Sequence, residues 1–210
     1  MITLYALVDH PGSPLLTLGE LSAVPLDGLA FVCGPAGDPG ASAERLWEHE
    51  RVVEGLMEER DLLPVRYGTR LRDESDAVRA LEERHDELAA ALGRVRGAVE
   101  LSLRVLGEQE ADTAQAVEIR SGADYMRAKA RAASAHAEVA RAVHEPLAVL
   151  SRATVERPPR IAGELLRAAY LVERSAVDGF VRQVAALQEA QPGLQLLCTG
   201  PWPAYSFSAA

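Results

Sequence analysis

Apolar residues in the first half of the chain follow two spacings, one typical of strands and one of helices. Short apolar runs at 2–8, 29–33 and 62–66 predict strands. Positions three and four apart are apolar over 42–60 and 75–92, which predicts two amphipathic helices. Ser42 stands where it can cap the first of these helices. The predicted inner face of that helix consists of Leu46, Val53, Leu56 and Met57.

The second half predicts six elements in the order strand, helix, strand, strand, helix, strand. They cover residues 99–105, 122–143, 154–157, 164–172, 175–189 and 194–198. The polar stretch 108–116 predicts a loop, and Pro146 is expected near or just after the end of the long helix. This order is that of the split βαβ, ferredoxin-like fold, in which both helices cover one face of an antiparallel sheet.

A domain boundary is predicted between Gly93 and Gly97, which bracket the change from helix to strand. The first half follows the same ferredoxin-like order if a weak helical turn at 15–21 replaces the first helix. We therefore predict an α+β protein with two tandem modules. They are an N-terminal, acidic ferredoxin-like domain at 1–93 and a C-terminal α+β domain of the split βαβ type at 94–199, followed by an extended aromatic arm at 200–210.

The arm combines three large aromatic residues with two prolines. Trp202, Tyr205 and Phe207 lie within six positions of a chain that is 5% aromatic. Pro201 and Pro203 fix φ and lack backbone donors, which excludes a helix or a central strand. Exposed aromatic side chains forfeit a large burial energy. The arm should therefore lie in a groove of its own chain or of a partner, and we favour packing on the body as a clasp that closes the second module.

The segment Leu62–Thr69 has the features of a contact site. Pro64 within a short apolar strand predicts an edge strand, because proline cannot donate to a central ladder. Arg66 and Tyr67 then lie beside the turn that Gly68 allows. Two interpretations stand side by side. The segment is either a surface for a partner or an internal staple, in which Arg66 pairs with one of the many nearby carboxylates.

Composition and charge restrict the partners. Of 210 residues, 48% are hydrophobic, which is enough for a proper core. Residues 1–93 hold 8 basic and 18 acidic residues, whereas 94–210 hold 14 and 13. Because nucleic acid and anionic membrane surfaces both require a basic footprint, this balance argues against them. The apolar runs are far shorter than the roughly 20 residues of a membrane span.

Two further features predict a cytoplasmic protein. The N-terminal residues read as a strand and lack the basic region of a signal peptide. The two cysteines, Cys33 and Cys198, each lie in an apolar strand-like run. Two such residues form no disulfide framework and fit a reducing compartment.

The residues that carry enzyme chemistry form no recognisable constellation. Phosphate-binding glycine motifs, a zinc-binding H-E-x-x-H and a C-x-x-C pair are all missing from the sequence. His49 and His85 fall beside apolar helix positions and are expected to pack there. His136 and His144 are eight residues apart, which separates them by about 12 Å along a helix, too far for one metal ion. We therefore predict no enzyme activity, no cofactor and no metal.

Four separated segments nevertheless resemble one known family, the gas vesicle protein F/L family (GvpF/GvpL). The resemblance covers essentially the whole chain, in the right order. The chain departs from the family pattern at Ala204 and Tyr67, and both changes keep shape and hydrophobicity. The matching segments are Leu62–Thr69 (LLPxR[FY]GT), Gly122–Lys129 (G-x-x-Y-[LM]-x-x-K, with Tyr125 and Lys129), Ala168–Phe180 (with Tyr170) and Thr199–Phe207 (TGPWPPYSF).

This resemblance implies a non-enzymatic role in gas vesicle biogenesis in the cytoplasm. The vesicle wall is a protein shell made mainly of one small, very hydrophobic protein. Members of the family are understood to contact that protein as minor shell components or assembly factors. The expected partners are therefore the major shell protein and other gas vesicle accessory proteins. The family's fold, a ferredoxin-like domain followed by a second α+β domain, agrees with the order of elements above.

The same segments provide the candidate contact residues. A soluble partner with an edge strand could hold shell subunits apart by strand addition, at 62–67 or at the aromatic arm. The alternative is that these motifs only dock the two modules. A different class of function, a small-ligand-binding regulatory module, would need a polar pocket at the junction, to which no sequence feature points. The candidates are Leu63, Pro64, Arg66, Tyr67, Tyr125, Lys129, Tyr170, Trp202, Tyr205 and Phe207.

Overall fold

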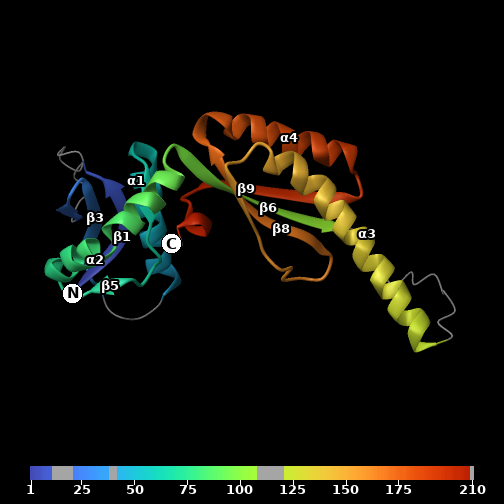
Figure 1. Cartoon of the computed structure of the whole chain (residues 1–210), viewed down its shortest axis with the longest axis horizontal. Coiled ribbons are helices and arrows are strands. Elements are labelled where there is room, and N and C mark those ends of the chain that lie inside the picture. The colour runs from blue at the N-terminus through green and yellow to red at the C-terminus, as the bar shows by residue number, and fades with distance from the viewer. Residues whose placement is uncertain (11–20, 38–41, 108–120, 209–210) are drawn as a thin grey trace. The chain divides into compact units, whose positions relative to one another are not determined.

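The computed structural model describes residues 1–10, 21–37, 42–107 and 121–208 (Figure 1). The predicted turn at 15–21 and the predicted loop at 108–116 lie wholly or mostly outside these residues. Within them the chain divides into two compact units, each built on an antiparallel sheet. Unit 1 consists of Met1–Glu100 and Pro201–Ala210, and unit 2 of Leu101–Gly200. The predicted α+β class is confirmed. The domain boundaries at residues 93 and 199 stay a prediction, because they concern which parts of the chain fold independently.

The sheet of unit 1 has the strand order β2-β3-β1-β4, and a fifth short strand, β5, also pairs with β1. Leu7 and Val8 of β1 face Phe31 and Ala30 of β3 in antiparallel register. Both strands were expected from their apolar runs. The strands are β1 (Ile2–Asp9), β2 (Ser22–Leu26), β3 (Leu29–Pro35), β4 (Leu62–Pro64) and β5 (Arg70–Leu71).

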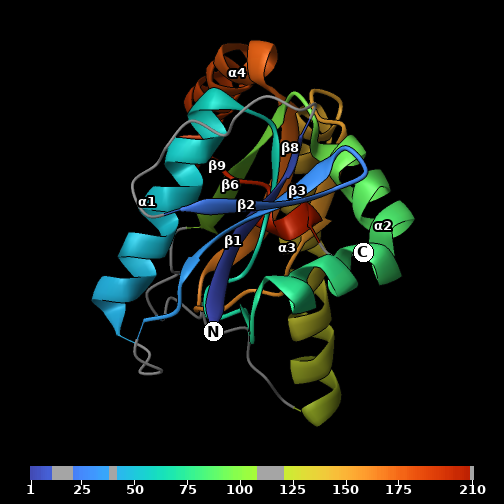
Figure 2. The ribbon, with the colours of Figure 1, turned by 90° about the vertical axis from the view of Figure 1, so that its left-hand side faces the viewer.

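Helices α1 (Ala43–Glu59) and α2 (Glu74–Val95) cover opposite faces of this sheet (Figure 2). The predicted cap is confirmed, since the Ser42 hydroxyl accepts a hydrogen bond from the Arg45 amide at 3.2 Å. Coverage of both faces explains the composition of β3, in which six consecutive residues are buried. A strand exposed on one face would alternate instead.

Three details of unit 1 differ from the prediction. Helices α1 and α2 lie on opposite faces of the sheet (Figure 2), whereas the ferredoxin-like order predicts both on one face. Leu46 was placed on the inner face of α1 but is 41% exposed, whereas His49 is 2% exposed. Strand β2 was not predicted, although Asp27-Gly28 is a strong hairpin signal. These two residues have φ values of +45° and +84°, and a two-residue turn with both φ positive matches the twist of a hairpin.

The sheet of unit 2 has the strand order β7-β8-β6-β9. Its elements follow the predicted order of strand, helix, strand, strand, helix, strand. Helices α3 and α4 contribute to one shared core with the strands, which places both on the same face (Figure 1). The elements are β6 (Ala98–Gly107), α3 (Gly122–Ala148), β7 (Ala153–Glu156), β8 (Glu164–Glu173), η1 (Arg174–Ala176), α4 (Val177–Ala190) and β9 (Leu194–Trp202).

Two proline positions extend elements beyond their predicted ends. Helix α3 continues through Pro146 to Ala148, because a proline in the last turn removes only one internal hydrogen bond. Strand β9 continues to Trp202, since an edge strand tolerates Pro201. The arm is therefore not extended throughout. Tyr205–Phe207 form a 3-10 turn, in which the Phe207 amide donates to the Ala204 carbonyl at 3.1 Å.

Candidate functional site

The ten predicted contact residues differ widely in exposure, and this separates packing residues from accessible ones. A side chain without exposed surface serves the core, whereas an exposed one is available to a partner. Leu63, Pro64 and Tyr170 are buried; Tyr67, Tyr205 and Phe207 are half-buried; Arg66, Tyr125, Lys129 and Trp202 are exposed.

The apolar part of the 62–69 segment belongs to the core of unit 1. Leu63 pairs with Leu7, and Pro64 pairs with Ala6. Strand β4 lies at one end of the strand order, as predicted, yet all three of its residues are buried. Leu63 and Pro64 are therefore explained by packing.

Arg66 lies just past this strand and is exposed. Its carbonyl accepts hydrogen bonds from the Thr69 amide at 3.2 Å and the Thr69 hydroxyl at 2.8 Å. These bonds close a turn at Gly68, where φ is +86°. Within the described parts of the chain, the Arg66 guanidinium makes no ion pair. An internal staple through Arg66 therefore has no carboxylate partner among the described residues. The Arg66 side chain is available to a partner protein.

Tyr67 forms one wall of a hollow of about 170 Å³ in unit 1. His49 lies beneath it and stacks on Tyr5, with ring centroids 5.0 Å apart. The rings of His49 and Tyr67 meet edge to face, with centroids 5.6 Å apart. His49 Nε2 lies 2.9 Å from the Val65 carbonyl oxygen. Because a carbonyl only accepts, Nε2 carries a proton, and the bond fixes the ring. His49 therefore packs as predicted and supports the floor of this hollow.

The charges around the hollow come from Arg45, Arg70 and Glu48. Arg45 reaches over Gly37, where an added Cβ would lie 4.0 Å from the guanidinium carbon. Burial raises the pKa of the Tyr5 hydroxyl, and the Glu48 carboxylate adds to this. Two guanidinium groups beside one carboxylate give the hollow the chemistry to hold a small anion.

The arm is held to unit 1 by two carboxylates that the sequence did not reveal. The Ser206 amide and hydroxyl each donate to Glu100 at 2.7 Å, and Glu100 is 7% exposed. The Tyr205 hydroxyl donates to Glu50 at 3.1 Å. Burial is the main cause that raises the pKa of Tyr205, so this hydroxyl stays protonated. No local pattern identifies these pairs, because their members lie 106 and 155 residues apart.

The aromatic side chains of the arm are less buried than predicted. Trp202 keeps 41% of its surface exposed, so the expectation that all three aromatic side chains are buried is wrong. Tyr205 and Phe207 are half-buried, while the small Ala204 is 3% exposed. The reason is local: Trp202 ends an edge strand, whereas the following turn carries the next residues onto unit 1.

Tyr170 lies at the centre of unit 2. It is fully buried, its hydroxyl lies 2.9 Å from His144 Nδ1, and its ring centroid is 5.1 Å from that of Phe180. Burial raises the pKa of Tyr170 well above its usual value. The fold fully accounts for this residue, so it is not a contact candidate.

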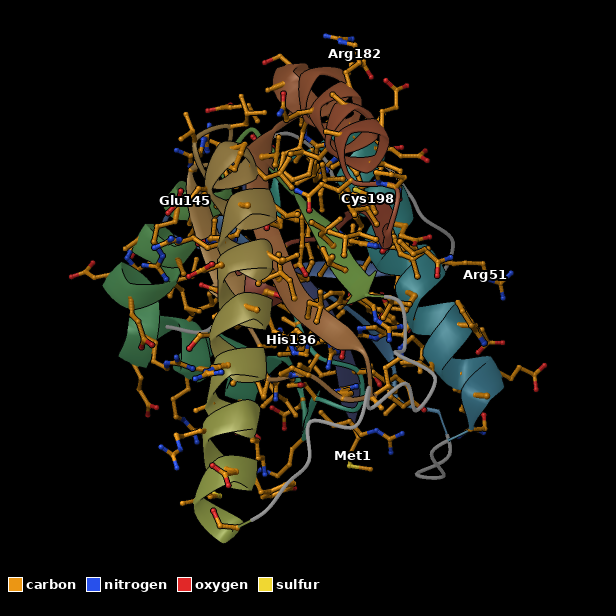
Figure 3. The ribbon with its side chains drawn as sticks, turned by 90° about the vertical axis from the view of Figure 1, so that its right-hand side faces the viewer. Met1, Arg51, His136, Glu145, Arg182 and Cys198 are labelled. Atoms are coloured by element: carbon orange, nitrogen blue, oxygen red, sulfur yellow. The ribbon has the colours of Figure 1, made fainter. Side chains whose placement is uncertain are left out.

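Tyr125 and Lys129 belong to the first part of α3. This part of the helix extends beyond the sheet (Figure 1). We call residues 121–138 the exposed half of α3. Tyr125 is 50% exposed and the neighbouring Met126 62%, whereas Val143 and Leu147 farther along belong to the core. Figure 3 shows His136 and Glu145 along the same helix.

The exposed half of α3 has a capped start, and its described side chains are mostly exposed. The Ser121 hydroxyl caps it by accepting from the Asp124 amide at 3.2 Å. Arg127 pairs with Asp124 at 3.1 Å. Most of the stability of helices in proteins comes from packing of an apolar face rather than from helix propensity. Two large apolar side chains on such a helix are typical of a surface that a partner covers.

Two further features concern the described residues, namely metal ligands and membrane-spanning helices. No group of three or more His, Cys, Asp or Glu side chains there is arranged to hold a metal ion. None of the described helices combines the length and the apolar character needed to cross a membrane.

Comparison with known sequences gives a consistent match. The model of the family described as "Gas vesicle synthesis protein GvpL/GvpF" matches residues 2–209. Gas vesicle protein L of Streptomyces sp. (strain CB03234) is 34% identical over 180 residues, which cover 76% of this chain and 67% of that protein. Gas vesicle protein F of the same strain is 28% identical over 181 residues, covering 77% and 76%.

Comparison with solved structures gives the same fold. GvpF from Anabaena sp. PCC7120 superimposes with a TM-score of 0.85 at 20% identity, covering 100% of this chain and 96% of that one. GvpF from Microcystis aeruginosa gives a TM-score of 0.86 at 18% identity, covering 100% and 99%. At these identities the likeness concerns the fold.

Proposed function

The chain belongs to the GvpL/GvpF family of gas vesicle synthesis proteins, and we propose that it binds the small hydrophobic shell protein during gas vesicle formation. In this role it is a non-enzymatic accessory protein of the cytoplasm, associated with gas vesicles as a minor shell component or a chaperone-like assembly factor. Other gas vesicle accessory proteins are further partners. We assign the shell-protein contact to the exposed half of α3.

One observation carries this assignment. Tyr125 and Lys129 belong to a segment that resembles the family, yet both are exposed on a helix that the core does not need there. Tyr170, in another such segment, is fully buried and explained by packing. Exposure of Tyr125 beside Met126 supports a role in contact, because large apolar side chains gain free energy when a partner covers them.

The charge of the chain suits a partner of a hydrophobic protein. The net charge is −9, and residues 1–93 alone carry −10. A shell protein with exposed apolar surface associates indiscriminately. A complex that keeps a large net charge resists such association through mutual repulsion. Unit 1 would thus keep the complex dissolved while α3 covers the apolar surface.

Co-purification with the shell protein tests the proposal. The double variant Tyr125→Ser, Met126→Ser should lose at least about tenfold in affinity, since two apolar contacts are removed. The matched controls Ile161→Ser and Val181→Ser, at side chains that are 51% and 47% exposed, should bind like the wild type. Equal binding by the α3 variant and the controls, with all variants folded, would reject this contact.

The same experiment separates the other accessible candidates. Arg66→Ala tests the turn after β4, and a chain that ends after Thr199 tests the arm. We expect neither to weaken binding as much as the α3 variant. If Arg66→Ala alone abolishes binding, the contact lies on unit 1 instead.

A second candidate function is a small-ligand-binding regulatory module, which was expected to use a pocket at the junction of the modules; we propose the hollow within unit 1 as its ligand site instead. Arg45 and Arg70 would hold an anionic group of the ligand there. Thermal denaturation in the presence of acetate, succinate and phosphate tests it. A rise in Tm for the wild type that is lost in Arg45→Ala, Arg70→Ala would favour this function, and the absence of any rise would dismiss it for these anions.

A further inference from the structure

Strand β9 is an edge strand without the usual protection against pairing. It is nine residues long, and residues 194–200 carry no charged side chain. Leu197 on this stretch is 38% exposed. Natural edge strands are commonly short or interrupted by proline or charge, because an open edge pairs with any free strand. In β9 the only proline, Pro201, comes after this stretch.

The other described edge strands carry such protection. Strands β2, β4 and β7 have five, three and four residues. Pro25 interrupts β2, and Pro64 ends β4. Glu156 ends β7 and is followed by Arg157. The long uncharged edge of β9 is therefore a local property and not a general feature of this fold.

A side chain from α4 occupies part of the β9 edge. The Gln188 Nε2 donates to the Leu194 carbonyl at 2.7 Å, and the Leu196 amide donates to Gln188 Oε1 at 2.8 Å. In a parallel pair, one residue donates its N–H to a carbonyl and accepts from the amide two residues farther along. The Gln188 carboxamide makes this same pair of bonds. It stands in the place of one residue of a parallel neighbouring strand.

The edge continues beyond this point. Residues two apart on a strand direct their amide and carbonyl groups to the same side. The Leu196 carbonyl and the Cys198 amide therefore point to the same edge of the strand as the Leu196 amide. Neither group bonds to a loop or a side chain in the described part of the chain. The Cys198 side chain packs toward the core on the helix side of the sheet, and Figure 3 labels it on β9.

We propose that β9 is a docking edge for an extended, uncharged, apolar segment of a partner protein, which adds as a parallel strand and displaces the Gln188 side chain. Main-chain hydrogen bonds supply the affinity, and the lack of charge along 194–200 selects an uncharged segment. The loss of the two Gln188 hydrogen bonds is offset, because the backbone of the incoming strand forms both bonds in place of the Gln188 carboxamide. This inference does not depend on the exposed half of α3 or on the identity of the shell protein.

A capped heptapeptide of alternating valine and threonine is a suitable probe for the full-length chain. Hydrogen exchange measured by NMR should slow at least about tenfold at the Cys198 amide when the peptide binds, since this group gains a partner. The same peptide N-methylated at every residue lacks donors and should leave the exchange rate unchanged. Protection by both peptides would show side-chain binding only and would overturn the proposal.

Two variants test the role of Gln188. Gln188→Ala should bind the peptide more tightly than the wild type, by about tenfold, because no side chain has to leave; its Leu196 amide should also exchange faster without peptide. Leu197→Lys places a charge on the strand and should weaken binding about tenfold. The proposal fails if neither the wild type nor Gln188→Ala protects Cys198 while both are folded. It also fails if Gln188→Ala simply dimerises through this edge, because the occupant is then a second copy.

Discussion

At the scale of single residues, the Glu164 carboxylate of unit 2 is held by two hydrogen bonds. The Arg160 amide donates to it at 2.6 Å and the Arg104 guanidinium at 2.7 Å, and its side chain has no exposed surface. These two hydrogen bonds hold the pKa of Glu164 below its usual value, the backbone bond contributing most. Both bonds favour the charged form, so folding and ionisation of this group are coupled.

The lowered pKa of Glu164 predicts how the stability of the fold depends on pH. A carboxyl with a lowered pKa stabilises the folded state above its unfolded pKa of about 4.3, and this contribution is lost as pH falls toward the folded value. Glu164→Gln should therefore lower the urea midpoint clearly at pH 7 and much less at pH 3. Glu173→Gln, which changes a more exposed carboxylate paired with Arg152, is the control. An equal effect of Glu164→Gln at both pH values would contradict this reasoning.

Tyr170 allows a test of the distinction between packing and contact residues. Tyr170→Phe removes the hydroxyl and leaves the half-buried His144 Nδ1 without this hydrogen-bond partner, which should lower the free energy of unfolding by about 1 kcal/mol. Tyr125→Phe makes the same chemical change at an exposed site and should alter it by less than about 0.5 kcal/mol. Urea denaturation measures both. Equal losses would mean that the two sites are not distinguished by burial.

Residue types alone could not make this distinction. Tyr125 and Tyr170 both lie in segments that resemble one family, yet one is half exposed and the other fully buried. Helical spacing similarly placed Leu46 on the inner face of α1, whereas the histidine three residues later is the one buried. Such outcomes depend on the position of neighbouring elements, which local spacing does not contain.

At the scale of elements, the aromatic arm is fixed by hydrogen bonds to buried charge. Ser206→Ala removes the hydroxyl donor from Glu100 and should cost about 1.5–3 kcal/mol, the range for bonds to charged groups. Ser134→Ala, at an exposed position of α3, is the matched control and should be close to neutral. If Ser206→Ala costs no more than this control, the arm is held by its aromatic side chains instead.

The order of the elements was largely predictable, while their ends and their long-range contacts were not. Apolar spacing predicted the strand–helix order of unit 2 because each element buries one face. The ends at Pro146 and Pro201 were missed because the effect of a proline depends on its place in a turn or at an edge. The contact between Glu100 and Ser206 joins residues 106 positions apart and leaves no trace in local sequence.

At the scale of the whole molecule, two kinds of surface stand apart from the packed interiors of the units. The exposed half of α3 presents Tyr125 and Met126, and the β9 edge presents the Leu196 carbonyl and the Cys198 amide, which bond to no loop or side chain among the described residues. The acidic residues concentrate in the first half of the chain, where 1–93 hold 18 of the 31. A large net charge of this kind favours solubility.

Hydrogen exchange of the chain with and without the shell protein, followed by mass spectrometry, tests the central claim most directly. In the free protein, peptides from 122–138 should exchange faster than those from 140–148, because only the latter pack on the core. In the complex, 122–138 should become protected at least about tenfold, with little change in β4. Stable co-purification without protection of 122–138 would contradict the account.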